Sequence, residues 1–249
     1  MAKKKPTADI SQVLVFPFKD EAWVKKMAIA SLLIFVSFIP VIPMVFLLGY
    51  LAEIIRRIAV EGEAPSLPEW DDLSVYFQDG FRLFGAGALY LIPSTLLLVV
   101  GYACMFIPIA IMEAGGMSDG EGIVLVIAGY LAGFGFMGIG AVIAMITGVI
   151  LPVAGSHTVV KNEFSAAFKF GEIWNIFRAN WSGFLVAFLI IIGGCVVLYY
   201  GSYFLVVTVI LCWLYPFAVC FLSAYLTLVG SALIADAYRV GLNNLPAEK

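Results

Sequence analysis

Long apolar runs without a charged residue dominate the pattern of the chain. Each run exceeds the ~20 residues that a helix needs to cross a bilayer. The last one is long enough for two spans, and YYGSY at 199–203 is the predicted turn between them, because Gly201 and Ser202 interrupt helices. In the third run, Pro152 predicts a kink or an end of the helix. The four runs are 27–52, 83–112, 123–160 and 179–235.

The first run is the exception, because Pro40 and Pro43 interrupt it. A single proline-kinked span would leave basic residues on both sides of the membrane. A hairpin that turns at the two prolines would instead place all 14 Lys and Arg residues on one side, opposite the acidic loop 113–122. The tendency of basic residues to stay on the cytoplasmic side favours the hairpin. Each arm, roughly 20 Å long, is shorter than the ~30 Å apolar core, so we predict a re-entrant hairpin.

With this hairpin, the chain divides into three similar units. Each unit starts with a predicted amphipathic helix at the cytoplasmic interface, followed by two apolar helices. When the units are aligned on Lys26, Arg82 and Arg178, each carries a small residue five positions later and a leucine two positions after that. We therefore expect one all-α, polytopic membrane domain over 1–249 with a candidate threefold internal repeat. The units are 10–58, with the re-entrant hairpin, and 70–160 and 163–240, with two spans each.

Composition supports a membrane protein and indicates no reaction. The mean hydropathy is +1.04 and 12% of residues are charged, whereas a soluble domain has about 25% charged residues. No ionisable residue lies deep in a run, which argues against ion-coupled transport. His157, the only histidine, is expected to be a polar residue near the cytoplasmic interface. Since no catalytic motif or CxxC pair is present, we expect no enzyme, no metal site, no cofactor and no nucleic-acid partner.

The densest group of charges lies between residues 53 and 82. Its paired acids could hold a divalent cation or act as an acid and a base. A simpler interpretation is that Asp71 and Asp72 cap and charge the start of a helix, and that Trp70 anchors it among headgroups. Arg56 and Arg57 would then pair with these acids or with lipid phosphate. The candidate contacts with lipid or a partner are Arg56, Arg57, Trp70, Asp71, Asp72, Arg82, Trp174, Arg178 and Trp181.

Glycines are dense in the third run. Gly129 and Gly133, and the series Gly140, Ala144 and Gly148, place small residues on one face of the predicted helix. Such a face lets helices approach closely, either inside the protein or between two copies of it. We favour packing inside the protein.

Four motifs in the first third of the chain follow one another in a fairly specific order, and they are FPFKDEAW (16–23), IPVIPMVFLLGY (39–50), IIRRIAVEGEAPSLPEWDD (54–72) and FQDG (77–80). In these motifs the chain resembles an uncharacterised prokaryotic membrane family, known as domain of unknown function 4013. Beyond Leu83 the likeness rests on hydropathy and on the segment around FGEIW (170–174). The resemblance implies a multi-span protein of the prokaryotic inner membrane and transfers no catalytic residue.

Two functions are compatible with these observations. The first, which we favour, is a non-enzymatic scaffold or accessory subunit that contacts lipids and another membrane protein or a second copy of itself. The second is a small uncoupled permease or pore with a path around the re-entrant hairpin, where broken helices expose backbone groups. An enzyme that acts on lipid headgroups through the acids of 53–82 is a distant third. In each case we expect both termini in the cytoplasm.

Overall fold

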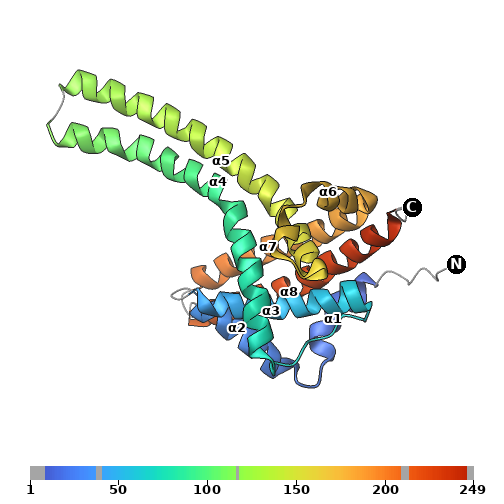
Figure 1. Ribbon diagram of the computed structural model, residues 1–249. Coiled ribbons are helices and arrows are strands. Elements are labelled where there is room, and N and C mark those ends of the chain that lie inside the picture. Colours follow the sequence, from blue (N-terminus) through green and yellow to red (C-terminus); the bar gives the residue numbers. More distant parts are fainter. Residues whose placement is uncertain (1–8, 38–40, 116–117, 209–212, 246–249) are drawn as a thin grey trace. The chain divides into compact units, whose positions relative to one another are not determined.

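The computed structural model describes residues 9–37, 41–115, 118–208 and 213–245, and this part of the chain is helical, without a strand. Clustering of contacts divides it into two compact units, Met1–Ala86 with Pro152–Lys249, and Gly87–Leu151. The elements (Figure 1) are α1 (Ile10–Lys19), α2 (Trp23–Val36), α3 (Ile42–Arg56), the π-helical turn η1 (Arg57–Glu61), α4 (Leu73–Glu113), α5 (Asp119–Lys161), the 3-10 turn η2 (Phe164–Phe168), α6 (Phe170–Ala179), α7 (Trp181–Val207) and α8 (Tyr215–Asn244).

Among the described residues, four helices are long and apolar enough to cross a membrane, and they are α4, α5, α7 and α8. They lie where the hydropathy pattern predicts four spans, and the all-helical fold class is confirmed. The predicted turn at 199–203 is wrong, because α7 continues through Gly201 and Ser202 as far as Val207. In apolar surroundings an unpaired backbone group is costly, so the helical hydrogen bonds outweigh the weak helix preference of these two residues. The helix ends at Thr208, beyond which 209–212 lie outside the described residues.

At two further points inside the long helices, the structure excludes a predicted alternative or differs from expectation. α5 does not end at Pro152 but continues to Lys161, in line with the tolerance of apolar helices for proline. The amphipathic segment that starts near residue 73 is the first part of α4 and not a separate helix. The second unit of the candidate repeat therefore lacks the break that separates α6 from α7, and the repeat stays a prediction.

The first apolar run forms two helices instead of one. α2 ends at Val36 and α3 begins at Ile42, and the two helices contact each other. Pro43 lies in the first turn of α3, where its missing N–H costs nothing, whereas Pro40 lies outside the described residues. Helices of 14 and 15 residues measure about 21–23 Å, less than the apolar core of a bilayer. The re-entrant course of this hairpin stays a prediction.

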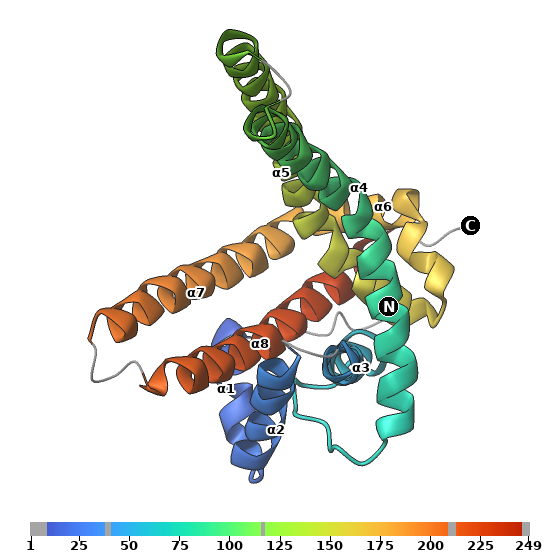
Figure 2. The ribbon, with the colours of Figure 1, turned by 90° about the vertical axis from the view of Figure 1, so that its left-hand side faces the viewer.

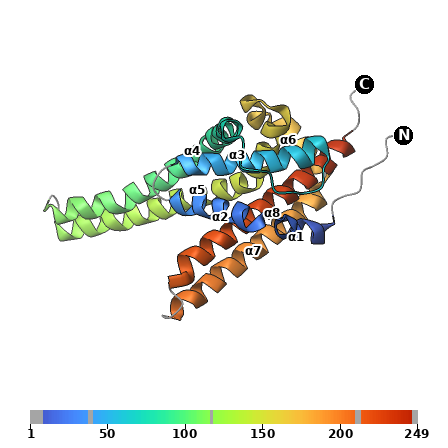
Figure 3. The same ribbon diagram turned by 90° about the horizontal axis from the view of Figure 1, so that it is seen from below.

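α8 is the central helix of the compact unit formed by Met1–Ala86 and Pro152–Lys249. It contacts α1, α2, α3, η1, α6 and α7, and α7 runs along it in Figures 2 and 3. Of the residues in its most apolar stretch, 39% are buried, compared with 11% for α4 and for α7. Small buried residues such as Ala224, Gly230 and Ala232 let the neighbouring helices approach its backbone closely. α8 is therefore surrounded by other helices of the protein on several sides.

The compact unit Gly87–Leu151 is a pair of helices, formed by the parts of α4 and α5 that it contains. Glycines of α5 line the contact: a methyl group on Gly129 would lie 2.3 Å from the carbonyl oxygen of Cys104, and one on Gly133 would lie 2.4 Å from Cγ of Met105. A methyl group on Gly140 would lie 3.2 Å from the carbonyl oxygen of Ser94 in α4, a tight but less severe contact. These three glycines therefore serve packing inside the protein. Gly148, in contrast, has open space around its α-carbon.

Candidate functional site

Three consecutive carbonyl groups of the loop after η1 each accept a hydrogen bond from a different helix. Nζ of Lys26, in α2, donates to the Leu67 carbonyl at 3.1 Å. The hydroxyl of Tyr50, in α3, donates to the Pro68 carbonyl at 2.9 Å, and the hydroxyl of Tyr76, in α4, donates to the Glu69 carbonyl. We call the carbonyls of residues 67–69 with their three donors the carbonyl clasp. It joins three helices through one short loop.

The loop takes this course because the helix before it is forced to stop. Gly62 has a left-handed backbone, with φ of 69°, and its N–H bonds to the carbonyl of Arg57. Glycine adopts this conformation without the steric penalty of a side chain. Pro65 and Pro68 then prevent a helix from restarting, and the side chain of Leu67 is buried, 4% exposed.

Lys26 is the charged centre of the clasp. Its side chain is 3% exposed, yet Nζ lies 2.7 Å from the Asp20 carboxylate and also contacts the Glu69 carboxylate. With the Leu67 carbonyl, these acceptors match the three donors of an ammonium group. Burial alone would lower the pKa of Lys26, but the hydrogen bonds to the two carboxylates outweigh it and raise that pKa. The hydrogen bond from Lys26 likewise lowers the pKa of Asp20.

Aromatic rings cover the clasp. Tyr50 and Trp70 stack with their ring centroids 4.0 Å apart and their planes 4° from parallel. Tyr76 lies edge-on to both rings, at 5.8 Å from each. The indole of Trp70 therefore has partners within the protein, and its predicted contact with lipid headgroups stays a prediction.

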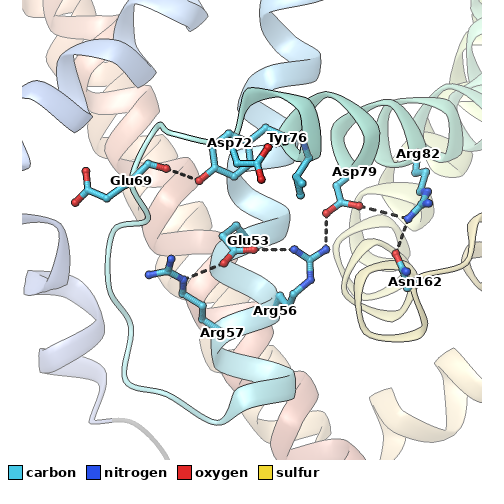
Figure 4. A network of polar contacts seen from close by, with 10 residues as sticks. Glu53, Arg56, Arg57, Glu69, Asp72, Tyr76, Asp79, Arg82 and Asn162 are labelled. Atoms are coloured by element: carbon cyan, nitrogen blue, oxygen red, sulfur yellow. Dashed lines mark hydrogen bonds and ion pairs between the residues drawn. The ribbon is translucent and has the colours of Figure 1, made fainter.

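A chain of ion pairs lies next to the clasp (Figure 4). The guanidinium of Arg56 bridges Glu53, at 2.7 Å, and Asp79 of α4, while Nε of Arg57 lies 3.0 Å from Glu53. Asp79 also contacts Arg82, whose Nη1 donates to the side chain of Asn162, just after α5. Arg56 and Arg57 therefore pair with acids of their own protein, although with Glu53 and Asp79 and not with Asp71 or Asp72. The network joins α3, α4 and the end of α5.

The two acids before α4 differ in their local contacts. Oδ1 of Asp72 accepts a hydrogen bond from the N–H of Val75 at 3.3 Å, which is the arrangement of an N-cap. Asp71 is exposed one position earlier. Among the described residues, no group of three His, Cys, Asp or Glu side chains is close enough to hold a metal ion.

Two glycines let α3 and α4 cross directly behind the clasp. A methyl group on Gly49 would lie 1.8 Å from the carbonyl oxygen of Tyr76, and one on Gly80 would lie 1.8 Å from that of Val45. No side chain fits at such distances. The crossing therefore places Tyr50 and Tyr76, the two phenol donors, next to the same loop.

His157 lies inside the protein, and its predicted position near the cytoplasmic interface stays a prediction. Its side chain is fully buried, and Nδ1 lies 2.6 Å from the hydroxyl of the equally buried Tyr238 in α8. Nε2 lies 3.3 Å from a carboxylate oxygen of Glu172 in α6, without the alignment of a hydrogen bond. The histidine therefore links the ends of α5, α6 and α8. The sequence gives no signal for this contact, because its partners lie on other helices.

The remaining predicted contact residues belong to α6 and the start of α7. Ile173 and Ile176 form the buried face of α6, which contacts α8. Trp174 and Trp181 are 54% and 57% exposed, and Arg178 is also exposed. Arg178 makes no ion pair within the described part of the chain. These three residues are free for an outside partner, whereas Arg56 and Arg82 are already engaged.

Comparison with known proteins gives a family and no activity. No curated protein and no solved structure matches the chain. A family of proteins of unknown function, DUF4013, matches residues 32–207, which is well over half of the chain. The match extends beyond the first third that carries the sequence motifs, through α4, α5 and α7, and it includes the clasp loop and the ion-pair network. The chain therefore belongs to the DUF4013 family of proteins of unknown function.

Proposed function

We propose that the protein is a non-enzymatic subunit or scaffold of a membrane complex, built to contact another membrane protein or a second copy of itself. The observation that carries the proposal is the outer surface of the Gly87–Leu151 unit. A pair of helices has one internal contact, so most of its apolar side chains point outwards. In the most apolar stretches of α4 and α5, 11% and 17% of the residues are buried.

Small residues on this outer surface support a protein partner in addition to lipid. Gly135, Gly138 and Gly148 of α5 have no atom within 4 Å of an added methyl group. Small residues lower the closest distance between two helices in a membrane, where dispersion contacts replace the hydrophobic effect as the driving force. Large exposed residues beside them, such as Leu131 and Met145, offer the matching contact area.

The proposal includes a topology in the inner membrane of a prokaryotic cell. α4, α5, α7 and α8 cross the bilayer, α2 and α3 form a re-entrant hairpin, and both termini lie in the cytoplasm. The distribution of basic residues supports this arrangement, as does the length of α2 and α3, which is too short for a crossing. α1 and α6 are proposed interfacial helices, since each has 10 residues and buries one face only.

Photo-crosslinking in intact membranes tests the subunit proposal. A photoreactive amino acid at Leu131 or Met145, which are 72% and 74% exposed, should give a defined protein adduct. Val197 on α7, 72% exposed, is the matched control for random encounters in the membrane. Adducts with lipid alone, or the same proteins at all three positions, would contradict the proposal. Saturable solute uptake by proteoliposomes of the purified protein would instead support the permease.

A further inference from the structure

We propose that Trp174, Arg178 and Trp181 form a binding site for the headgroup of an anionic phospholipid. The inference rests on the proposed position of α6 at the membrane surface and adds the ligand that this surface binds. It is an interaction of the protein with the bilayer itself, separate from any contact made by the Gly87–Leu151 unit.

The junction between α6 and α7 fixes the height of this site relative to the bilayer. α6 ends at Ala179 and α7, a candidate span, begins at Trp181. The side-chain amide of Asn180 donates to the carbonyl of Ala237 at 2.9 Å, which ties the junction to α8. A methyl group on Gly183 would lie 2.4 Å from Nδ2 of that amide, so the side chain of Asn180 would have to shift away from its present position. The site therefore lies at a helix junction that a hydrogen bond holds against α8, at the start of the candidate span α7.

Packing leaves the three side chains pointing away from the protein. Ile173 and Ile176 turn the opposite face of α6 inwards. Trp174 and Arg178, four residues apart, share the outer face of the helix. The ring of Trp174 stacks on Phe177, with centroids 5.7 Å apart, and Phe177 contacts the buried Phe184 of α7. Through these ring contacts, the exposed indole of Trp174 rests against Phe177, which rests against the buried Phe184.

The charges of the region favour an anion. Glu172, the acid of α6, has Lys161 at 3.6 Å and Lys169 at 4.0 Å, and Lys169 also pairs with Glu163 at 3.6 Å. The region has a net positive charge, because the three cations Lys161, Lys169 and Arg178 outnumber the two carboxylates of Glu163 and Glu172. Since the lysines face the acids, Arg178 is the cation that remains for a ligand.

The chemistry of the three residues matches a phospholipid at the water boundary. A guanidinium can donate two parallel hydrogen bonds to a phosphate, which an ammonium cannot reproduce. Tryptophan side chains favour the level of the headgroups and the upper acyl chain. An anionic lipid is favoured over a zwitterionic one, because each basic residue near the surface contributes about 1 kcal/mol towards an anionic membrane.

Native mass spectrometry of the purified, detergent-solubilised protein tests this site. The protein is equilibrated with equal amounts of phosphatidylglycerol and phosphatidylcholine, and the ratio of the two bound lipids is measured. Arg178→Gln should lower this ratio about fivefold, as expected for one cation at the surface. Arg178→Lys should retain part of the preference, because it keeps the charge and loses the paired hydrogen bonds.

Lys19→Gln is the matched control, since Lys19 is an exposed cation at the end of α1. Because α1 is also a proposed interfacial helix, this charge loss should lower the lipid ratio, but by clearly less than Arg178→Gln does. An equal loss in Arg178→Gln and Lys19→Gln, or no loss in either, would overturn the proposal. Thermal unfolding checks that each variant is folded. If the lipid ratio changes as expected but Leu131 gives no protein crosslink, only the subunit proposal fails. If Leu131 gives the crosslink but the lipid ratio does not change as expected, only the lipid site is refuted.

Discussion

At the scale of single residues, the carbonyl clasp explains why a short polar loop is fixed in place beside apolar helices. A buried lysine is costly unless its ammonium group finds acceptors, and Lys26 has two carboxylates and the Leu67 carbonyl. Its partners come from the chain before α2 and from the loop after η1. The lysine therefore fastens the end of α1 to the same loop that Tyr50 and Tyr76 hold.

Lys26→Met should lower the free energy of unfolding by about 1–3 kcal/mol, since it leaves a buried carbonyl without a donor. The pH dependence follows from the two pKa directions. The lowered pKa of Asp20 gives stability that is present above about pH 4 and is lost as the pH falls further. The raised pKa of Lys26 gives stability that is present below about pH 10 and is lost as the pH rises through its folded value.

Thermal unfolding across this pH range is the measurement, with Lys25→Met, at the exposed neighbouring position, as the control. Lys25→Met should keep the plateau between about pH 4 and pH 10. A wild-type profile in Lys26→Met would show that the clasp contributes no stability.

Gly49→Ala should destabilise the protein by about 2 kcal/mol or more, because the added methyl group would collide with the backbone of Tyr76 and force α3 and α4 apart. Gly193→Ala makes the same change in α7, where nothing lies within 4 Å of the added methyl group, and should be neutral or slightly stabilising. Unfolding midpoints of the two variants in one detergent compare them directly. Equal midpoints would mean that the crossing of α3 and α4 is not close.

At the scale of helices, hydropathy predicted the four long apolar helices well, because lipid imposes a minimum length on any helix that crosses it. It failed for the end of α7, since Gly201 and Ser202 break helices in water and are tolerated in apolar surroundings. The clasp was beyond prediction for another reason. Lys26 and Leu67 are 41 residues apart, and a backbone carbonyl leaves no trace in the residue type. Lys26 also could not be distinguished from Lys25, although one is buried and the other exposed.

The contact between His157 and Tyr238 should hold the ends of α5 and α8 together. Tyr238→Phe and His157→Phe should each cost about 1–3 kcal/mol, because each leaves a buried polar partner without a hydrogen bond. The double variant should cost less than the sum of the two, since both partners are then removed. A double-mutant cycle from unfolding midpoints gives the coupling. Tyr199→Phe, at an exposed tyrosine of α7, is the control, and additive losses would contradict the contact.

At the scale of the whole molecule, the proposed topology can be tested independently of any activity. In a background without the native cysteines, single cysteines at Ser66 and Ser165 should be protected from an impermeant thiol reagent in intact cells, while one at Ser118 should react. All three side chains are exposed in the structure, so protection would reflect the membrane and not burial. Labelling of both Ser66→Cys and Ser165→Cys from outside, with Ser118→Cys protected, would instead fit a single crossing of the first apolar run and would refute the re-entrant hairpin.

The central position of α8 has a consequence for how the cell makes this protein. α8 follows α1, α2, α3, α6 and α7 in the chain, so the ribosome releases all of its partners before it. Until α8 is inserted, the faces that these helices bury against it have no protein surface to pack on. Contacts between neighbouring helices, such as α2 with α3 and α6 with α7, can form earlier, but their common core is completed only when α8 is made, in contrast to domains that fold from the N-terminus during synthesis. We therefore expect a chain that stops before Tyr215 to be unstable and readily degraded, because it lacks the helix that its other helices pack against.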